Sequence, residues 1–191
     1  MDFKTAVNDA VNALKNGGLI LYPTDSVWAL GCDATNKQAV EKITSLTKKE
    51  PGKGMVIIAR DMNMVARFVK EIPAVAEEVA ELSDQPVTII YPKGVSLAPG
   101  VTAKDGSVAI RVVNHPFCNA LLTRFGKPIV ATLPAAGSSE ADIARDFYQI
   151  DDAIVQQADW CADTDLDDVS TGKLSSLISL GIGGEVKIIR K

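Results

Sequence analysis

The chain has 191 residues, of which 47% are hydrophobic and 23% charged, so it is long enough to bury a large core as one domain over residues 1–191. Its net charge of −4 argues against general nucleic-acid binding, and contact with RNA would need a local basic patch. The three cysteines are widely spaced, which argues against a disulfide framework or a structural zinc site.

Residues 1–18 lack the basic-then-apolar order of a signal peptide. No apolar run approaches the roughly 18 residues that a membrane span needs. We therefore expect a cytoplasmic protein that has no membrane partner.

Helices and strands alternate through the first half of the chain. Apolar residues at helical spacing from Phe3 to Leu14 predict a helix that ends at Gly17-Gly18. The elements expected next are a strand at Leu19–Tyr22, a helix around 39–46 capped by Thr35 or Asn36, a strand at Met55–Ala59, a short helix from Asp61 to Phe68, and a helix from Pro73 to Leu82.

The second half continues the alternation and closes with two β-rich segments. The expected strands are Val87–Tyr91, Val108–Val112, Pro128–Thr132, Leu174–Leu180 and Glu185–Arg190, and the expected helices are Pro116–Phe125, one capped by Ser138 or Ser139 and running to Phe147, and Ile150–Ala158. The GIGG sequence between the last two strands is typical of a tight reversal, which predicts an antiparallel hairpin. The sequence thus predicts an α/β protein with a mixed parallel and antiparallel sheet.

A cluster of small polar side chains follows the first predicted strand. Thr24, Asp25 and Ser26 place two hydroxyls and a carboxylate at its carboxyl end, where open α/β sheets usually hold their ligands. The alternative is an ordinary turn begun by Pro23, in which the hydroxyls bond their own backbone. Both interpretations fit the spacing.

Three lysines, Lys48, Lys49 and Lys53, lie in a Gly/Pro loop between a predicted helix and a buried strand. Such a loop suits a polyanion, although a solvated lysine loop would look the same. His115, the only histidine, lies three residues before Cys118 near a predicted helix start, where a thiolate would be favoured. A buried structural cysteine is the stronger interpretation, because no orienting residue accompanies the pair.

The stretch YPTDSVWALGCDA resembles the YPT(E/D)TVYGLGCDA signature of the YrdC/TsaC family, the threonylcarbamoyl-AMP synthases of tRNA modification. Further similarities are TKKEPGKGM to the family's lysine loop, QPVTIIYP to GPxTLxLP, and VAIRVVNHP to VxxRVPxHP. GKLSSLISL and VKIIRK also resemble the family's closing segments. The resemblance implies a YrdC-like fold, a twisted mixed sheet flanked by helices with a concave basic cavity.

The resemblance also implies site residues. Those expected to bind L-threonine are Thr24, Ser26, Arg111 and Ser175. Those expected to bind the nucleotide are Lys48, Lys53, Thr88, Thr132, Ser176 and Arg190. A structural ion pair is the alternative for Arg111, and alternation on an interior strand is the alternative for the two serines.

The implied activity is that of a nucleotidyltransferase, which condenses L-threonine, bicarbonate and ATP into threonylcarbamoyl-AMP and pyrophosphate, with Mg²⁺ carried by the phosphates of ATP. Expected partners beyond these substrates are tRNA or double-stranded RNA and other threonylcarbamoyl-transfer proteins. Catalysis would rest on positioning and charge stabilisation, without a protein nucleophile.

Three positions depart from the family pattern. Glu50 replaces an arginine of the lysine loop, and Leu133 and Ala135 replace a serine and an asparagine that serve the nucleotide. A charge pair at 4 Å is worth about 4 kcal/mol near a protein surface, so the reversed charge at Glu50 would weaken triphosphate binding. The departures favour an alternative, a divergent paralogue that binds a nucleotide or double-stranded RNA in the same cavity without making the adenylate.

Overall fold

The computed structural model describes residues 2–50, 52–81, 83–135 and 143–191. Its helices are α1 (Phe3–Lys15), α2 (Lys37–Thr47), α3 (Met62–Ala66), α4 (Ala76–Glu81), α5 (Pro116–Phe125) and α6 (Asp152–Val155), with 3-10 turns at Phe147–Gln149 and Thr164–Leu166. Its strands are β1 (Ile20–Tyr22), β2 (Ala29–Gly31), β3 (Val56–Ala59), β4 (Val87–Tyr91), β5 (Val108–Val112), β6 (Ile129–Val130), β7 (Trp160–Cys161), β8 (Ser176–Leu180) and β9 (Val186–Arg190).

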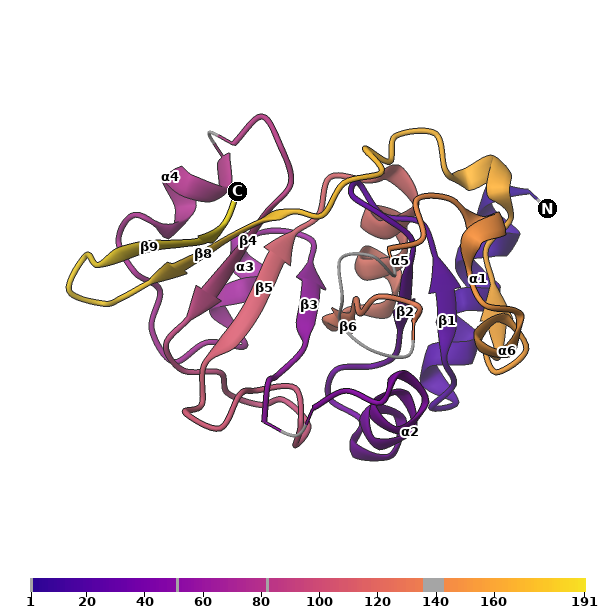
Figure 1. The fold of residues 1–191 in the computed structure, drawn as a ribbon, viewed down its shortest axis with the longest axis horizontal. Helices are drawn as coiled ribbons and strands as arrows, with labels where there is room; N and C mark the ends of the chain where they lie inside the picture. The colour runs from indigo at the N-terminus through magenta and orange to yellow at the C-terminus, as the bar shows by residue number, and fades with distance from the viewer. Residues whose placement is uncertain (1, 51, 82, 136–142) are drawn as a thin grey trace.

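The strands form two sheets, whose orders are β2-β1-β7 and β6-β3-β5-β4-β8-β9 (Figure 1). The pairs β1–β7, β3–β5 and β4–β8 are parallel, and the other neighbours are antiparallel. Both pairing types occur within each sheet, so the predicted mixed sheet is confirmed. The predicted closing hairpin is also confirmed, as β8 and β9, which extend away from the remaining elements at one end of the molecule (Figure 1).

Strand β6 connects the two sheets. It pairs with β3, and the segment around it also bridges to β2 and the residues just after it, through Leu30–Thr132 and Asp33–Ile129. Gly31 permits this close approach, because a Cβ at that position would collide with the carbonyl oxygen of Val130 and the ring of Tyr22. These contacts bring the ends of β1 and β6 close to the middle of the larger sheet.

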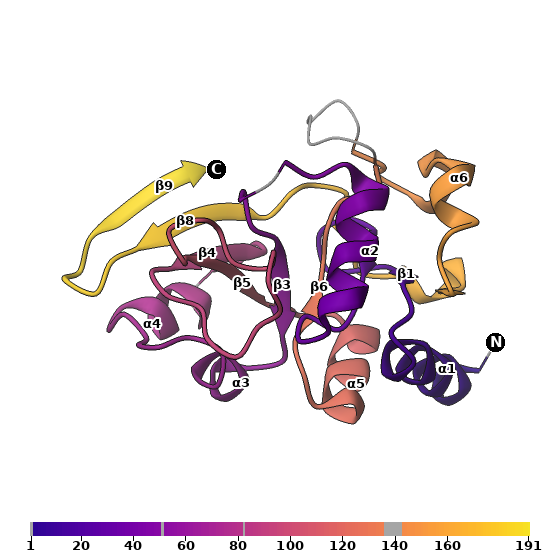
Figure 2. The ribbon, with the colours of Figure 1, turned by 90° about the horizontal axis from the view of Figure 1, so that it is seen from below.

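Helices α1, α3, α4 and α5 lie along one side of the molecule, the lower side in Figure 2. Helix α1 packs against α5 and β7, whereas α3 contacts β3 and β5, and α4 contacts β4. Figure 1 shows α2 below β2 and β6, with its axis pointing toward the viewer. Local sequence explains where several of these helices begin: Asn36 caps α2, Asp61 caps α3, and Pro116 occupies the first turn of α5.

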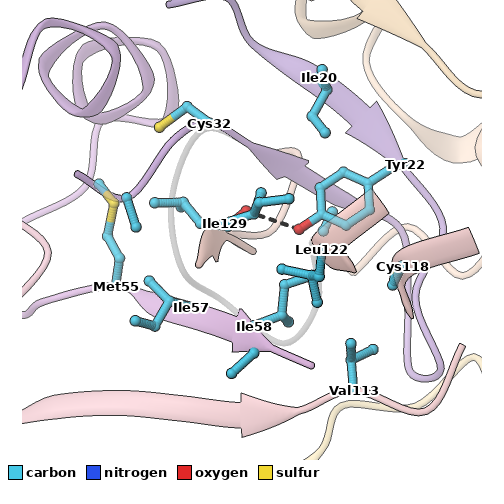
Figure 3. Close-up of a cluster of buried hydrophobic side chains, with 14 of the residues drawn as sticks. Ile20, Tyr22, Cys32, Met55, Ile57, Ile58, Val113, Cys118, Leu122 and Ile129 are labelled. Atoms are coloured by element: carbon cyan, nitrogen blue, oxygen red, sulfur yellow. Dashed lines mark hydrogen bonds between the residues drawn. The ribbon is translucent and has the colours of Figure 1, made fainter. Parts of the chain in front are cut away.

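Aliphatic and aromatic side chains from both sheets meet in a continuous core. Figure 3 shows Tyr22 of β1 facing Leu122 of α5 and the isoleucines of β3. The Tyr22 hydroxyl is fully buried and donates to the carbonyl oxygen of Val130 at 2.9 Å, so the ring ties β1 to β6 without leaving an unsatisfied donor.

Most predicted elements are confirmed, and the differences involve short segments. Strands β2 and β7 were not predicted, because three and two residues are too few for a periodic pattern. Helix α4 starts at Ala76 instead of Pro73, and the helix expected at Ile150–Ala158 is reduced to α6. The predicted cap at Ser138 or Ser139 lies outside the described residues, and the end of that helix was wrong, because residues 143–146 are not helical and a 3-10 turn begins at Phe147. No helix in the described part of the chain is long and apolar enough to cross a membrane.

Candidate functional site

The loop after β1 is buried and fixed by its own hydroxyls. The Thr24 hydroxyl donates to the carbonyl oxygen of Val27 at 2.7 Å, and the backbone N–H of Ser26 donates to the Thr24 hydroxyl at 3.2 Å. Thr24 is fully buried, and its hydroxyl lies 3.0 Å from that of Ser26. These hydrogen bonds to the loop's own backbone are the ones that the turn interpretation predicts. The Ser26 hydroxyl nevertheless faces strand β5, where it accepts from Arg111.

Arg111 of β5 holds this loop in place. Its Nη1 donates to Asp25 Oδ1 and to Ser26 Oγ, both at 2.6 Å, and its Nη2 donates to Thr24 Oγ1 at 3.2 Å. The backbone N–H of Asn114 donates to the second oxygen of Asp25 at 2.9 Å. Arg111 is therefore in the buried ion pair that the sequence left as an alternative, and Asp25 is a central residue that the resemblance did not single out.

The hydroxyls of Thr88 and Ser175 join β4 to the segment before β8. They lie 2.7 Å apart, and both residues are buried. The Arg190 guanidinium lies close by, since its Nε and Nη2 donate to the carbonyl oxygen of Ser175 at 3.1 and 2.9 Å. Three predicted site residues thus meet at this point, one from each of three chain segments.

A cavity of about 210 Å³ lies where these segments converge. Its lining is polar and cationic on one part and apolar on the rest, and none of the described residues that line it carries a carboxylate. The lining residues are Ser26, Val27, Trp28, Ala29, Lys49, Val56, Arg111, Ala131, Thr132, Leu133, Leu174, Ser175 and Arg190. Positive groups beside hydroxyls and an apolar wall suit a small anionic ligand, such as a hydroxylated amino acid.

The lysine that lines the cavity is neither of the two that were expected to bind the nucleotide, Lys48 and Lys53. Lys48 is exposed and ends α2 in the left-handed conformation, with φ of 49°. Lys53 forms a 2.9 Å ion pair with Glu50 at the surface. Lys49 lines the cavity instead, and burial, together with the nearby charge of Lys53, lowers the pKa of its ammonium group.

The remaining expected nucleotide residues are divided between two hollows. Thr132 and Arg190 line the cavity, whereas Ser176 lines a groove of about 840 Å³ that adjoins it at Leu174 and Arg190. The cationic residues of this basic groove are Arg145, Lys173, Arg190 and Lys191. Thr88 lines neither hollow and reaches the cavity only through its bond to Ser175.

Two further residues shape the cavity and were not among the expected ones. Trp28 forms part of its wall, and the indole N–H donates to Asp167 at 2.6 Å while the ring lies 5.2 Å from that of Phe147. Leu133 places an apolar side chain on the wall, at a position where the family pattern has a serine. Ala135, the other departure from that segment, is not among the lining residues.

His115 and Cys118 lie in the core beside this region. The Cys118 thiol donates to the carbonyl oxygen of Pro23 at 3.2 Å, and burial raises the pKa of the thiol. His115 is fully buried, burial lowers its pKa, and neither ring nitrogen has a hydrogen-bond partner in the described part of the chain. Burial disfavours the charged forms of both residues, so the geometry supports the structural interpretation of Cys118 over the nucleophilic one.

Comparison with known proteins gives consistent matches over most of the chain. A family model described as Sua5_yciO_yrdC, telomere recombination, matches residues 12–191. The threonylcarbamoyl-AMP synthase of Saccharophagus degradans is 35% identical over 147 residues, which is 74% of this chain and 77% of that protein. The threonylcarbamoyl-AMP synthase of Aliivibrio fischeri is 36% identical over 129 residues, 66% of this chain and 70% of that protein.

Solved structures have the same fold. The crystal structure of E. coli YciO matches with a TM-score of 0.81 and 25% identity, over 100% of this chain and 90% of YciO. The crystal structure of P. abyssi Sua5 complexed with L-threonine matches with a TM-score of 0.80 and 20% identity, over 94% of this chain and 52% of Sua5. At this identity the second likeness concerns the fold alone.

Proposed function

The chain belongs to the Sua5/YciO/YrdC family, and from this we propose that it is a threonylcarbamoyl-AMP synthase serving tRNA modification. The observation that carries the proposal is the 35% identity to a protein of that name across 77% of its length. The reaction would convert L-threonine, bicarbonate and ATP into threonylcarbamoyl-AMP, pyrophosphate and water.

The cavity supports this chemistry through its charge. The amino group of threonine attacks the carbon of bicarbonate and water leaves, which gives a carbamate; a carbamate oxygen then attacks the α-phosphorus of ATP, and pyrophosphate leaves. Carboxylate, carbamate and phosphate are all anionic, and the lining supplies Lys49, Arg111 and Arg190 without a carboxylate among its described residues. Such a site lowers the barrier by holding the reactants together and by stabilising negative charge.

The threonine end of the cavity would be the region around Arg111. Its buried guanidinium lies against the Ser26 hydroxyl, and the Ser175 hydroxyl also lines the cavity. We propose that the substrate carboxylate approaches Arg111 and that the serine hydroxyls meet the substrate's polar groups. Because Asp25 already pairs with Arg111, the guanidinium would be held in one orientation before the substrate arrives.

Mg²⁺ would come with ATP, bound to its phosphates. Among the described residues, no group of three or more His, Cys, Asp or Glu side chains is arranged to hold a metal ion. The cationic side chains of the basic groove, Lys173 and Arg190 among them, have the chemistry to receive the departing pyrophosphate.

One observation favours a second candidate, a paralogue that binds a nucleotide or double-stranded RNA without making the adenylate. Leu133 lies on the cavity wall, where an apolar side chain offers no hydrogen bond to a phosphate or ribose. The Glu50 carboxylate lies beside Lys53 and neutralises it. Both features would weaken ATP binding relative to the family pattern.

A pyrophosphate-release assay tests the proposed function. We expect release that requires ATP, L-threonine and bicarbonate together and that stops when any one is omitted. Release without threonine would indicate simple ATP hydrolysis. If no pyrophosphate forms while ATP or double-stranded RNA still binds, the second candidate is correct.

A further inference from the structure

Strand β9 is the free edge of the larger sheet. Among the described elements it pairs with β8 alone, whereas β6, at the other edge of that sheet, is bridged to the smaller sheet. In the smaller sheet β2 takes part in that bridge, and β7 has only two residues. Figure 1 shows β8 and β9 extending away from the remaining elements, which leaves room for another strand beside β9.

Apolar side chains of β9 are exposed. Val186 and Ile188 are each 57% exposed, and Ile189 is 48% exposed. The register places Val186 opposite the buried Leu180, and it places Ile188 opposite the half-buried Ile178. Because residues opposite each other share a face of the sheet, the apolar surface of the core continues outward onto β9. An exposed apolar edge strand is a site at which another strand can pair.

The hydrogen bonds of the hairpin determine which backbone groups of β9 point outward. The N–H of Gly181 donates to the carbonyl oxygen of Glu185 at 2.8 Å, so the backbone of Glu185 faces β8. Bonded and non-bonded positions alternate along an antiparallel pair. The N–H and C=O groups of Val186 and Ile188 therefore point to the free edge, where they can bond to a further strand.

Two opposite charges flank Val186. Glu185 and Lys187 are both exposed, and within the described part of the chain neither forms an ion pair. When two copies of β9 pair antiparallel with Val186 opposite Val186, each Glu185 lies opposite Lys187 of the other copy. Centring the pair on Lys187 would instead place two lysines opposite each other, which is destabilising. The charges thus suit self-pairing in one register.

We propose that β9 pairs antiparallel with β9 of a second copy of this chain, with Val186 at the two-fold axis. The N–H of Val186 in each copy would donate to the carbonyl oxygen of Val186 in the other. The register of β9 shifts beyond Ile188, and this irregularity confines the pairing to residues 184–188. Because a two-fold interface uses the free edge of both copies, the assembly closes as a dimer.

Pairing on its outer edge would hold β9 from both sides. Arg190 of this strand lines the cavity and donates to the carbonyl oxygen of Ser175. Dimerisation would therefore steady a strand that contributes to the candidate site. It does not depend on which reaction the cavity carries out.

Charge reversal tests both the partner and the register. Glu185→Lys would set two positive charges opposite each other, and Lys187→Glu would set two negative charges opposite each other, whereas the double variant would restore opposite charges. Lys4→Glu, an exposed reversal on α1 at the other end of the molecule, is the matched control (Figure 1). Analytical ultracentrifugation at low salt, over a range of protein concentrations, would give the Kd of the dimer, and circular dichroism would check that each variant is folded.

We expect the wild type and Lys4→Glu to form the same concentration-dependent dimer. Each single reversal in β9 should weaken it by about tenfold or more, and the double variant should return to within about threefold of the wild type. An equimolar mixture of Glu185→Lys and Lys187→Glu should form a heterodimer, because every facing pair is then opposite in sign. Val186→Pro should also prevent dimerisation, since it removes an outward N–H that β8 does not use.

Three results would overturn the proposal. A wild type that stays monomeric at every concentration would exclude self-pairing and leave the edge to a strand of another protein. A dimer that neither reversal weakens would show that the copies meet elsewhere. Single variants that are monomeric and do not combine when mixed would exclude the register centred on Val186.

Discussion

The guanidinium of Arg111 and the carboxylate of Asp25 form a 2.6 Å ion pair, in which the two residues are only 4% and 7% exposed. The pair joins strand β5 to the loop after β1, and the N–H of Asn114 completes the coordination of the carboxylate. The loop that carries Ser26 is therefore held by charge as well as by its own hydroxyls.

Asp25→Asn should be strongly destabilising, because it leaves the buried Arg111 charge without its partner. We expect a loss of about 3–5 kcal/mol in the free energy of unfolding, measured by urea denaturation with circular dichroism. Glu41→Gln, which removes the exposed pair with Lys37, is the control and should cost less than about 0.5 kcal/mol. Equal small losses in the two variants would contradict the importance of the buried pair.

Lys49→Met should stabilise the protein at neutral pH. Burial lowers the pKa of Lys49 in the folded state below its ordinary value of 10.5, so the unfolded chain binds the proton more tightly and charging this lysine costs stability. The penalty is fully present below the folded-state pKa and disappears as the pH rises through the folded-state pKa toward 10.5.

Urea denaturation of the wild type and Lys49→Met from pH 7 to pH 10.5 would measure the effect. The stability difference between the two proteins should shrink as the pH rises, whereas Lys48→Met, at an exposed position, should follow the wild type throughout. A difference that stays constant with pH would show that the substitution acts through packing alone.

The fold could be predicted largely from local patterns, and the cavity only in part. Pro116–Phe125 was predicted to the residue, because proline at the first turn and a left-handed glycine after Phe125 mark both ends of α5. Strand β2 was missed because Ala29–Gly31 is too short for a pattern, and it is held by β1 and by the bridge from Leu30 to Thr132.

The sequence could not show which lysine enters the cavity, because the backbone conformation at the end of α2 decides it. Sequence patterns do not distinguish Lys48, Lys49 and Lys53 from one another. In the structure Lys48 adopts the left-handed conformation at the end of α2, and Lys49 is the residue that reaches the cavity. The Asp25 carboxylate was visible in the sequence, yet its partner lies 86 residues away. Such residues come together only because β3 pairs with both β5 and β6, and the segment after β6 bridges to β2 beside the β1 loop.

Ser175→Ala should reduce discrimination between L-threonine and L-valine. The Ser175 hydroxyl lines the cavity and is fixed by Thr88, so it can meet a substrate hydroxyl that valine lacks. In the wild type, calorimetry should show threonine binding about 100-fold or more tightly than valine, because a site built to bond a hydroxyl is left with unpaired groups. Equal binding of the two amino acids by the wild type would remove threonine from the proposal.

The three departures from the family pattern should act jointly to weaken adenylate synthesis. Leu133 presents an apolar side chain to the cavity, and Glu50 neutralises Lys53 through their 2.9 Å ion pair. Ala135 lies two residues beyond Leu133, outside the lining. Single repairs should therefore do little, because each leaves the other deficiencies in place.

Restoring all three as Glu50→Arg, Leu133→Ser and Ala135→Asn should raise pyrophosphate release by more than the sum of the single changes, since residues that share one ligand couple. The opposing expectation starts from Lys49, which already lines the cavity and could serve ATP without the family's arginine. In that case the wild type turns over readily and the triple variant gains nothing. Side-by-side assays at limiting ATP decide between them, because robust wild-type turnover would refute the joint effect of the departures while supporting the synthase activity itself.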